Sequence, residues 1–303
     1  MYTMLRKLIP FAITALALII GMPIQAMAGT AVDQLERQVV VPDDPRRVVS
    51  LAPSITEIIY ALEQGNRLKG VTRFSDYPPE AIKLPRVGSY VRLDMERIVA
   101  LNPDLCIATK DGNPQAIIDR LVLLKIPVYV VNPHNLDSIL ETVLDIGAIL
   151  NAGDRAKKLT ASLRARIQRV KSRVARVNYR PRVFFQIGIS PIVSAGTDTF
   201  IHELIEVAGG KNLAEGPLAY PRFSTEQVLA LEPEVIIITS MARQTVFEKV
   251  KAEWRRWPNL AAVRDERIFI VNSDLFDRPS PRLVSGLEDL TRLIHPELQE
   301  PSQ

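Results

Sequence analysis

The hydrophobic pattern of the chain occurs twice, once in each half. The segment from Leu93 to Thr109 reads LDMERIVALNPDLCIAT, and the segment from Phe223 to Thr239, which begins 130 positions later, reads FSTEQVLALEPEVIIIT. In each copy, apolar residues at helical spacing are followed by a proline-marked turn and a continuous apolar run. Each copy predicts a short helix, a turn and a buried strand. Two copies predict two lobes of similar build, with a ligand held between them.

Strand and helix signals alternate around both copies of the repeat. Residues 46–135 predict one α/β lobe and residues 182–297 predict a second. In the second lobe, Asp198 is the predicted cap of one helix, and Ser224 with Gln227 predicts a capping box at the repeat helix. The predicted fold class is therefore α/β, with two similar α/β lobes joined by a single long backbone helix and a ligand cleft between the lobes.

Residues 136–178 carry the pattern that predicts this linking helix. Apolar residues recur at helical spacing from Leu136 to Val177, with a break or kink expected near Gly153. A helix of forty residues reaches about 60 Å at 1.5 Å per residue, which is enough to run the length of both lobes. We expect one rigid crossing of this kind to permit less hinge closure than a pair of flexible strands.

Arginine and lysine are concentrated between Arg155 and Arg182, although the formal net charge of the whole chain is only +4. Within this stretch the basic residues alternate with Leu, Ile and Val at helical spacing, and aromatic residues are almost absent. Such a pattern is typical of an amphipathic helix with a solvated basic face rather than of a nucleic-acid-binding surface. We therefore expect no nucleic-acid partner.

Residues 1–28 have the composition of a cleavable signal peptide. Arg6 and Lys7 precede an apolar core from Leu8 to Ile20, and Ala26-Met27-Ala28 forms a cleavage site. The apolar run is short for a membrane span and contains proline, and no cysteine follows it, so we expect neither a membrane anchor nor a lipobox. We therefore predict that the protein is exported to the periplasm and is a monomer. The chain that remains after cleavage is long enough to form two lobes with their own cores.

Polar and aromatic loops adjoin the predicted strands and repeat helices, and all of them can face one cleft. They read LAPSITE, FSDYPPE and GSYVR in the first lobe, and QIGISP, AYPRFS and NSDLFDRPSPR in the second. Tyr90 and Tyr220 are again 130 positions apart, which predicts aromatic side chains on opposite walls of the cleft. Such walls suit a large, flat or ring-shaped ligand held by packing and hydrogen bonds rather than by charge.

At these loops the chain resembles the cobalamin-binding members of the helical-backbone periplasmic binding protein family, which also includes haem and ferric-siderophore binders. The resemblance covers Arg46 to Leu293 and rests on the motifs SDYPPE, ERIVALNPDL, FQIGISP, the Tyr-Pro pair before STEQVLA, and SDLFDRPSPR. It implies capture of cobalamin or a related corrinoid in the periplasm, with small lobe motion, and delivery to an ABC importer. The corrinoid would be the transported ligand, and no cofactor or metal site is expected.

The resemblance also implies the residues of the ligand site. Phe74 stands where the family has a corrin-contacting tyrosine, and two tyrosines replace family tryptophans, so aromatic faces are kept in each place. Asp274 and Arg278 match the aspartate and the arginine of the loop that caps the ligand. An alternative role for them is a local ion pair that shapes the turn before Pro279. Neutral amide arms offer donors and acceptors, which adds a serine and a glutamine as candidates. The ligand-binding candidates are Phe74, Tyr90, Tyr220, Asp274, Arg278, Ser54 and Gln186.

Glu96 and Glu226 match the surface glutamates with which the family engages arginines of the membrane-embedded permease. A glutamate in the first turn of a helix is also favoured by the helix dipole, whatever its function. Their recurrence at equal places in both lobes nevertheless favours a two-point docking surface, because opposite charges orient and accelerate docking. The family's second-lobe disulfide has no counterpart, because Cys106 is the only cysteine.

Two ligands of related proteins remain as alternatives. A haem protein would use Tyr90 or Tyr220 as the axial ligand. A ferric-siderophore protein would require several arginines that converge on an anionic chelate, and only Arg278 and Arg222 are placed for this.

Metal binding and catalysis are less well supported. The three histidines are His134, His202 and His295, and only His134, in the loop NPHN, is a candidate for a ligand contact. The apolar run around Cys106 favours a buried structural cysteine over a catalytic thiol. The sequence contains no G-x-S-x-G elbow, no phosphate-binding loop and no H-E-x-x-H helix, so we do not expect an enzyme.

Overall fold

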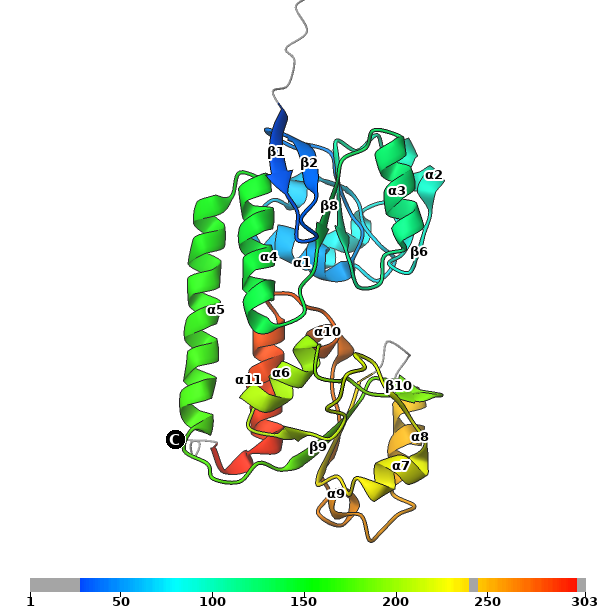
Figure 1. Cartoon of the computed structure of the whole chain (residues 1–303), viewed down its shortest axis with the longest axis vertical. Helices are drawn as coiled ribbons and strands as arrows, with labels where there is room; N and C mark the ends of the chain where they lie inside the picture. The colour runs from blue at the N-terminus through cyan, green and yellow to red at the C-terminus, as the bar shows by residue number, and fades with distance from the viewer. Residues whose placement is uncertain (1–27, 240–244, 299–303) are drawn as a thin grey trace, which may run out of the picture.

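The two repeat copies occupy equivalent places in two lobes that are stacked along the long axis of the molecule (Figure 1). The computed structural model describes residues 28–239 and 245–298. Residues 1–27 of the predicted signal peptide lie outside this part of the chain. In the part that the structure describes, no helix has the length and apolar character needed to cross a membrane.

The first lobe contains a parallel sheet with the strand order β4-β3-β7-β8. The central strand β7 is wholly buried, because helices cover both faces of the sheet. α1 and α4 pack on one face, and α2 and α3 pack on the other. The elements of the lobe are β1 (Ala28–Val32), β2 (Gln38–Pro42), β3 (Val48–Ser50), α1 (Pro53–Ala61), η1 (Gly65–Arg67), β4 (Leu68–Gly70), η2 (Pro79–Lys83), β5 (Gly88–Ser89), β6 (Arg92–Leu93), α2 (Met95–Ala100), β7 (Leu105–Thr109), α3 (Gln115–Leu123) and β8 (Val128–Val131).

The second lobe repeats this arrangement with the strand order β12-β9-β14-β15. β9 and β14 take the places of β3 and β7, and all the strands of this sheet are parallel. The elements are β9 (Arg182–Gln186), β10 (Gly188–Ile189), β11 (Ile192–Val193), α6 (Phe200–Val207), β12 (Lys211–Asn212), β13 (Arg222–Phe223), α7 (Thr225–Ala230), β14 (Val235–Ile238), α8 (Thr245–Trp254), α9 (Ala261–Arg264), β15 (Ile268–Ile270), α10 (Ser273–Phe276), α11 (Leu283–Ile294) and η3 (Pro296–Leu298). The predicted α/β class with two similar lobes is confirmed.

The helix caps agree with the sequence in the repeat and differ from it at α6. Ser224 and Gln227 form the predicted capping box at α7. The cap of α6 is Thr199, whose side chain accepts a hydrogen bond from the backbone N–H of His202, and not Asp198. Asp198 stands one position too early, because a capping side chain reaches the second or third residue of the helix that follows it.

The linking segment reverses direction instead of forming one continuous helix. It contains α4 (Leu136–Ile149) and α5 (Gly153–Val174), which lie side by side (Figure 1). The turn passes through Asn151 at a positive φ of 56°, a conformation that ends a helix. Gly147 allows the close contact, because a Cβ atom there would lie 2.4 Å from Cβ of Ala156. The expected 60 Å crossing is therefore wrong: α5 has 22 residues and spans about 33 Å.

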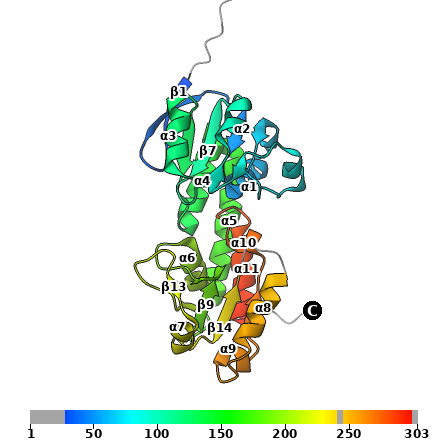
Figure 2. The same ribbon diagram turned by 90° about the vertical axis from the view of Figure 1, so that its right-hand side faces the viewer.

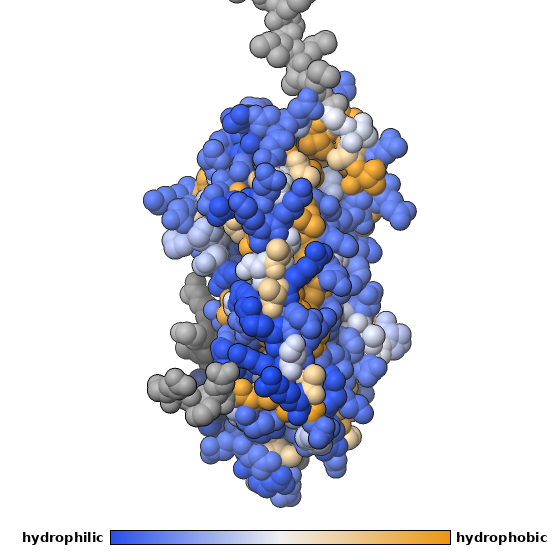
Figure 3. Space-filling view, turned by 90° about the vertical axis from the view of Figure 1, so that its left-hand side faces the viewer, coloured by the Kyte–Doolittle hydropathy of each residue, from blue (hydrophilic) through white to orange (hydrophobic). Residues whose placement is uncertain are grey.

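Each of the two linking helices contributes apolar side chains to the cores of both lobes. The first turns of α4 contribute Leu136 and Ile139 to the core of the second lobe, and its last turns contribute Val143 and Ile146 to the core of the first. α5 likewise begins in the first core and continues into the second, passing behind both lobes (Figure 2). The opposite side of the helix pair is largely hydrophilic, in agreement with the predicted solvated basic face (Figure 3).

Candidate functional site

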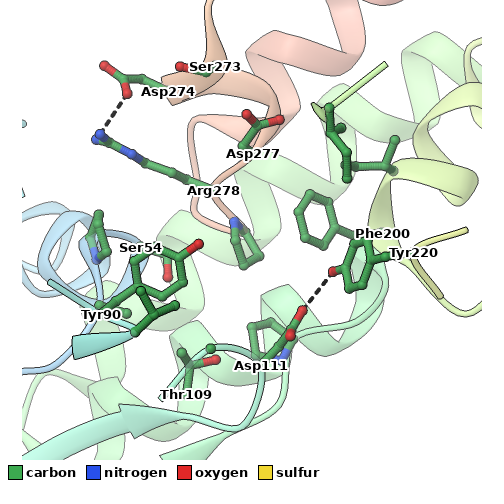
Figure 4. Close-up of a pocket in the computed structure, with 18 residues that line it drawn as sticks. Ser54, Tyr90, Thr109, Asp111, Phe200, Tyr220, Ser273, Asp274, Asp277 and Arg278 are labelled. Carbon is green, nitrogen blue, oxygen red and sulfur yellow. Dashed lines mark hydrogen bonds and ion pairs between the residues drawn. The ribbon is translucent and has the colours of Figure 1, made fainter. Parts of the chain in front are cut away.

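A cavity of about 380 Å³ lies between the lobes, and both lobes line it (Figure 4). Most of its lining is apolar or aromatic, with a small number of polar side chains, as is typical of small-molecule sites. The first lobe contributes Ala52, Pro53, Ser54, Tyr90, Val91, Thr109, Asp111, Gly112 and Pro133, and the second contributes Ile187, Phe200, Ile201, Tyr220, Ser273, Asp274, Asp277, Arg278 and Pro279.

Tyr90 forms part of the first-lobe wall and is held there by the loop after β7. The side-chain amide of Asn113 donates to the carbonyl oxygen of Tyr90 at 2.7 Å and to that of Leu51 at 2.9 Å. The tyrosine ring lies against Gly112, where an added Cβ would come within 2.5 Å of Cε2 of Tyr90. Gly112 also has a φ of +108°, a backbone conformation that favours glycine. Glycine is therefore required here both by the contact with the ring and by the backbone conformation.

Tyr220 forms the equivalent wall of the second lobe and makes a hydrogen bond across the cleft. Its phenolic hydroxyl donates to Oδ2 of Asp111 at 2.7 Å, which joins the two lobes (Figure 4). Burial, together with this bond to Asp111, raises the pKa of Tyr220 well above its ordinary value. The hydroxyl therefore stays protonated and remains a donor. Both tyrosines lie on opposite walls of one cavity, as their spacing in the repeat predicted.

A second hollow, of about 290 Å³, adjoins this cavity. The two hollows share the hydrogen-bonded pair Asp111 and Tyr220 in their linings, together with Pro133 and Phe200. His134 lines only the second hollow, and its Nδ1 lies 3.0 Å from the carbonyl oxygen of Asn132.

Arg278 lines the cavity, but its guanidinium binds acceptors from both lobes. It is paired with Asp274 at 2.6 Å, which is the local ion pair considered as the alternative role of these residues (Figure 4). It also donates to Oε1 of Glu57 at 2.9 Å, to Oδ1 of Asp76 at 3.0 Å and to the carbonyl oxygen of Phe74 at 2.9 Å. Three carboxylates therefore compensate the charge of this one guanidinium.

Glu57 is the centre of this contact between the lobes. Its side chain is only 2% exposed, and it accepts hydrogen bonds from Ser280 at 2.6 Å and from Arg282 at 3.2 Å, in addition to Arg278. The guanidinium of Arg282 also lies 3.7 Å from the ring centre of Tyr77 in the first lobe. Burial raises the pKa of Glu57, and the bonds from Ser280 and Arg278 oppose that rise.

Three carboxyl groups also line the cavity. They belong to Asp111, to Asp274, which is paired with Arg278, and to Asp277. Burial raises the pKa of Asp277 to about 7, against the opposing effect of a 2.8 Å hydrogen bond from the hydroxyl of Thr239. Burial and the nearby Asp111 and Asp277 also raise the pKa of Tyr90. The field in the cavity therefore disfavours anions and suits neutral or cationic groups.

Three further site predictions have different outcomes. Ser54 lines the cavity at the start of α1. Phe74 is not part of the cavity lining, and its role at the cleft comes from its backbone carbonyl. Gln186 requires a correction, because it is buried in the second lobe, donates to the carbonyl oxygen of Gly188 and accepts from Nε1 of Trp254. Its amide is thereby satisfied inside the lobe and does not reach the cavity.

Several lining residues were not predicted from the sequence, notably Asp111, Asp277 and Phe200. One signal was available: Thr109 and Thr239 are equivalent positions of the two repeat copies, 130 positions apart, and lie at the end of β7 and directly after β14. Thr109 lines the cavity directly, whereas Thr239 bonds to Asp277. The loop NSDLFDRPSPR was predicted to face the cleft, but the sequence did not indicate a role for Asp277 within it, because the neighbours of Asp277 come from distant parts of the chain.

Glu96 and Glu226 occupy the second position of α2 and of α7 and are exposed. The hydroxyl of Ser224 and the helix backbone hold the pKa of Glu226 below its ordinary value, so the carboxylate is charged at neutral pH. α2 and α7 lie at the side of the molecule away from α5, one in each lobe (Figure 1).

The histidines other than His134 have structural contacts. His202 bonds to Asn212, and His295 is buried against the carbonyl oxygen of Gly209. Within residues 28–239 and 245–298, no group of three or more His, Cys, Asp or Glu residues has the arrangement of a metal site. Cys106 is buried in β7, and burial raises the pKa of its thiol to about 12.

Comparisons with known proteins agree on one family. A family model described as periplasmic binding protein matches residues 48–275. The vitamin B12-binding protein of Yersinia pestis (strain Pestoides F) is 33% identical over 245 residues, which cover 80% of this chain and 84% of that protein.

Solved structures extend the comparison to the fold. The periplasmic vitamin B12 binding protein BtuF of Vibrio cholerae superimposes with a TM-score of 0.74 at 31% identity, covering 86% of this chain and all of that one. The periplasmic heme-binding protein RhuT from Roseiflexus sp. RS-1 gives a TM-score of 0.75 at 28% identity, covering 84% and 99%. Overall shape therefore does not separate these two ligand classes, and the side chains of the cavity must do so.

We predict that Glu57→Ala destabilises the protein by roughly 3–5 kcal/mol, because it leaves two arginines partly buried without their shared carboxylate. Urea denaturation of the purified protein measures this change. Asp289→Ala, which removes the partner of Arg292 on the exposed side of α11, is the matched control and should cost less than about 1 kcal/mol. Equal losses in both variants would contradict the role given to Glu57.

We also predict a pH-dependent contribution of Asp277 to stability. Its folded-state pKa of about 7 lies above the ordinary value of 3.8, so the stability that it contributes is present below about pH 4 and is lost as the pH rises through 7. Compared with Asp277→Asn, the native protein should therefore lose free energy of unfolding between pH 5 and pH 8. Denaturation curves at both pH values test this, with Asp265→Asn, at an exposed carboxylate, as the control. If the free energies of unfolding of the native protein and of Asp277→Asn differ by the same amount at pH 5 and at pH 8, the prediction is contradicted.

Proposed function

Because the chain belongs to the periplasmic binding protein family, we propose that it captures cobalamin or a related corrinoid in the periplasm and delivers it to an ABC importer. Export through a cleavable signal peptide, without a lipid anchor, is part of this proposal. The corrinoid is the transported ligand rather than a resident cofactor, and the protein acts as a monomer without catalysing a reaction.

The observation that carries the corrinoid proposal is the combination of opposed aromatic walls with an acidic cavity. Tyr90 and Tyr220 offer ring faces from the two lobes to a flat macrocycle. The carboxylates of Asp111, Asp274 and Asp277 can accept hydrogen bonds from the N–H groups of neutral amide arms. A corrin ring with amide arms therefore matches both the aromatic faces and the charge of the lining.

Haem and ferric siderophores fit this cavity less well, although proteins of the same fold bind haem. An anionic chelate or a haem propionate requires a cation with unused donors. Within the described residues that line the cavity, the only guanidinium is that of Arg278, and three carboxylates already bind it. Arg222 is exposed and is not part of the lining. Axial ligation by a tyrosine needs a phenolate, and the pKa values of both Tyr90 and Tyr220 are raised.

Binding of a corrinoid requires the cavity to enlarge. Its volume of about 380 Å³ lies near the lower end of the range of roughly 300–1,000 Å³ for ligand pockets, whereas a corrin with its side chains is a large ligand. Breaking the Asp111–Tyr220 hydrogen bond would join the cavity to the second hollow. We infer that ligand binding replaces this bond and brings His134 to the edge of the enlarged site.

The same proposal assigns docking on the permease to Glu96 and Glu226. Both occupy the second position of a short helix, one in each lobe, and both are exposed. Their carboxylates can form charge-assisted contacts with arginines of the permease, which orient the receptor on the importer.

We predict tight binding of cobalamin in a titration followed by absorbance and calorimetry, and weak or no binding of haem and of a ferric siderophore. Binding of cobinamide alongside cobalamin shows whether the lower base contributes. Tyr90→Ala and Tyr220→Ala should each weaken corrinoid binding about 30-fold, since each loses roughly 2 kcal/mol of aromatic burial. Tyr179→Ala, at an exposed tyrosine just before the second lobe and outside the cavity lining, is the control and should leave the affinity unchanged. Tight capture of haem or of an iron chelate, with no response to corrinoids, would overturn the proposal.

We predict that Glu96→Ala combined with Glu226→Ala reduces corrinoid uptake at least 10-fold and leaves the affinity for the free corrinoid within about 2-fold, because the substituted positions lie outside the cavity. Uptake into proteoliposomes that contain the importer measures the first effect, and calorimetry measures the second. The exposed pair Glu141→Ala and Glu215→Ala controls for the loss of two charges. Collapse of ligand binding together with uptake would show that the glutamates do not act in docking.

A further inference from the structure

Arg92 and Arg222 occupy the same place in the two copies of the repeat. They are 130 positions apart, as are the glutamates proposed for docking. If the two copies are compared from the wall tyrosines onward, eight positions carry the same residue. These positions are Tyr90 and Tyr220, Arg92 and Arg222, Glu96 and Glu226, Ala100 and Ala230, Leu101 and Leu231, Pro103 and Pro233, Ile107 and Ile237, and Thr109 and Thr239.

The arginine and the glutamate are the only charged residues among these shared positions, and all four side chains are exposed. Most of the other shared residues have evident roles in the fold or the cavity, such as the turn at the proline and the buried strand at the isoleucine. A folding requirement does not explain a guanidinium on the surface at the same place in both lobes. An interaction outside the chain does explain it.

Local structure gives the two arginines equivalent settings. Arg92 begins the short strand β6 and Arg222 begins the short strand β13, and each strand leads directly into the capping residue of the repeat helix. Among residues 28–239 and 245–298, no carboxylate lies within ion-pair distance of either guanidinium. By contrast, Arg97, which is not repeated, is paired with Asp94.

One short segment therefore carries three functions in each lobe. Residues 90–96 and 220–226 each begin with a tyrosine that lines the cavity, continue with an exposed arginine and end with the exposed glutamate of the docking helix. Neither arginine lines the cavity or the second hollow, so a contact with the ligand does not account for them.

We propose that Arg92 and Arg222 are the second half of the docking surface, which then presents one positive and one negative group in each lobe. This inference rests on the proposed docking of Glu96 and Glu226. Its partner is the periplasmic face of the importer's permease, which must present carboxylates opposite the arginines as well as arginines opposite the glutamates. Charges of both signs at each contact exclude shifted docking more strongly than glutamates alone, because a shifted register brings like charges together.

The test is the affinity of the corrinoid-loaded protein for its importer, purified and reconstituted in nanodiscs. Arg92→Glu combined with Arg222→Glu should weaken docking at least 10-fold, mainly through a slower association rate, with corrinoid affinity unchanged within about 2-fold. Arg92→Lys with Arg222→Lys should retain most of the affinity, because the charge is kept. The matched control is Arg120→Glu with Arg256→Glu, which changes the net charge equally at one exposed arginine in each lobe, outside the repeat segments.

The outcomes separate this inference from the function on which it rests. If the reversed Arg92 and Arg222 pair docks as well as the control pair, while Glu96→Ala with Glu226→Ala still docks poorly, the inference is overturned and the proposed function stands. If the unmodified protein binds neither corrinoid nor importer, both are overturned. Equal unfolding midpoints for the two reversed pairs exclude misfolding as the cause, and Arg92→Gln with Arg222→Gln gives a second, milder measurement.

Discussion

The burial of one helix pair in two cores is the constraint on which the rest of the structure depends. α4 and α5 each supply apolar side chains to both lobes, so the lobes cannot separate without exposing part of each core. The apolar surface lost to water makes such a separation costly. The distance between the two cavity walls is therefore set by packing on the far side of the molecule, which agrees with a receptor that binds its ligand with small lobe motion.

A second contact between the lobes determines the chemistry of the cavity. Glu57 from the first lobe binds Arg278 and Arg282 from the second. Because Arg278 has the only guanidinium in the described lining and is bound in this way, no guanidinium of the lining is left to bind an anionic ligand. A residue that resembles a ligand contact thus becomes part of the scaffold. The cavity is left with carboxylates and aromatic rings, and this balance, rather than the shape of the fold, separates a corrinoid from the anionic ligands of related proteins.

The internal repeat connects the cavity with the outer surface. In each lobe a single short segment passes from a wall tyrosine to an exposed arginine and an exposed glutamate. The repeated build of the two lobes gives two such connections, and the linking helices hold them in a fixed relation.

The sequence by itself determined the two α/β lobes, the repeat helices with the capping box at Ser224, the placement of Tyr90 and Tyr220 on opposite walls, and the family. The lobes, the helix caps and the opposed tyrosines follow from local periodicity, capping and the internal offset of 130 positions, whereas the family was indicated by the resemblance of its loop motifs. The tertiary structure alone decided the reversal at Asn151, the burial of Gln186 and the bonds of Tyr220 and Arg278. Each of these depends on groups from distant parts of the chain, and burial and pairing between such groups exist only after the lobes have packed together.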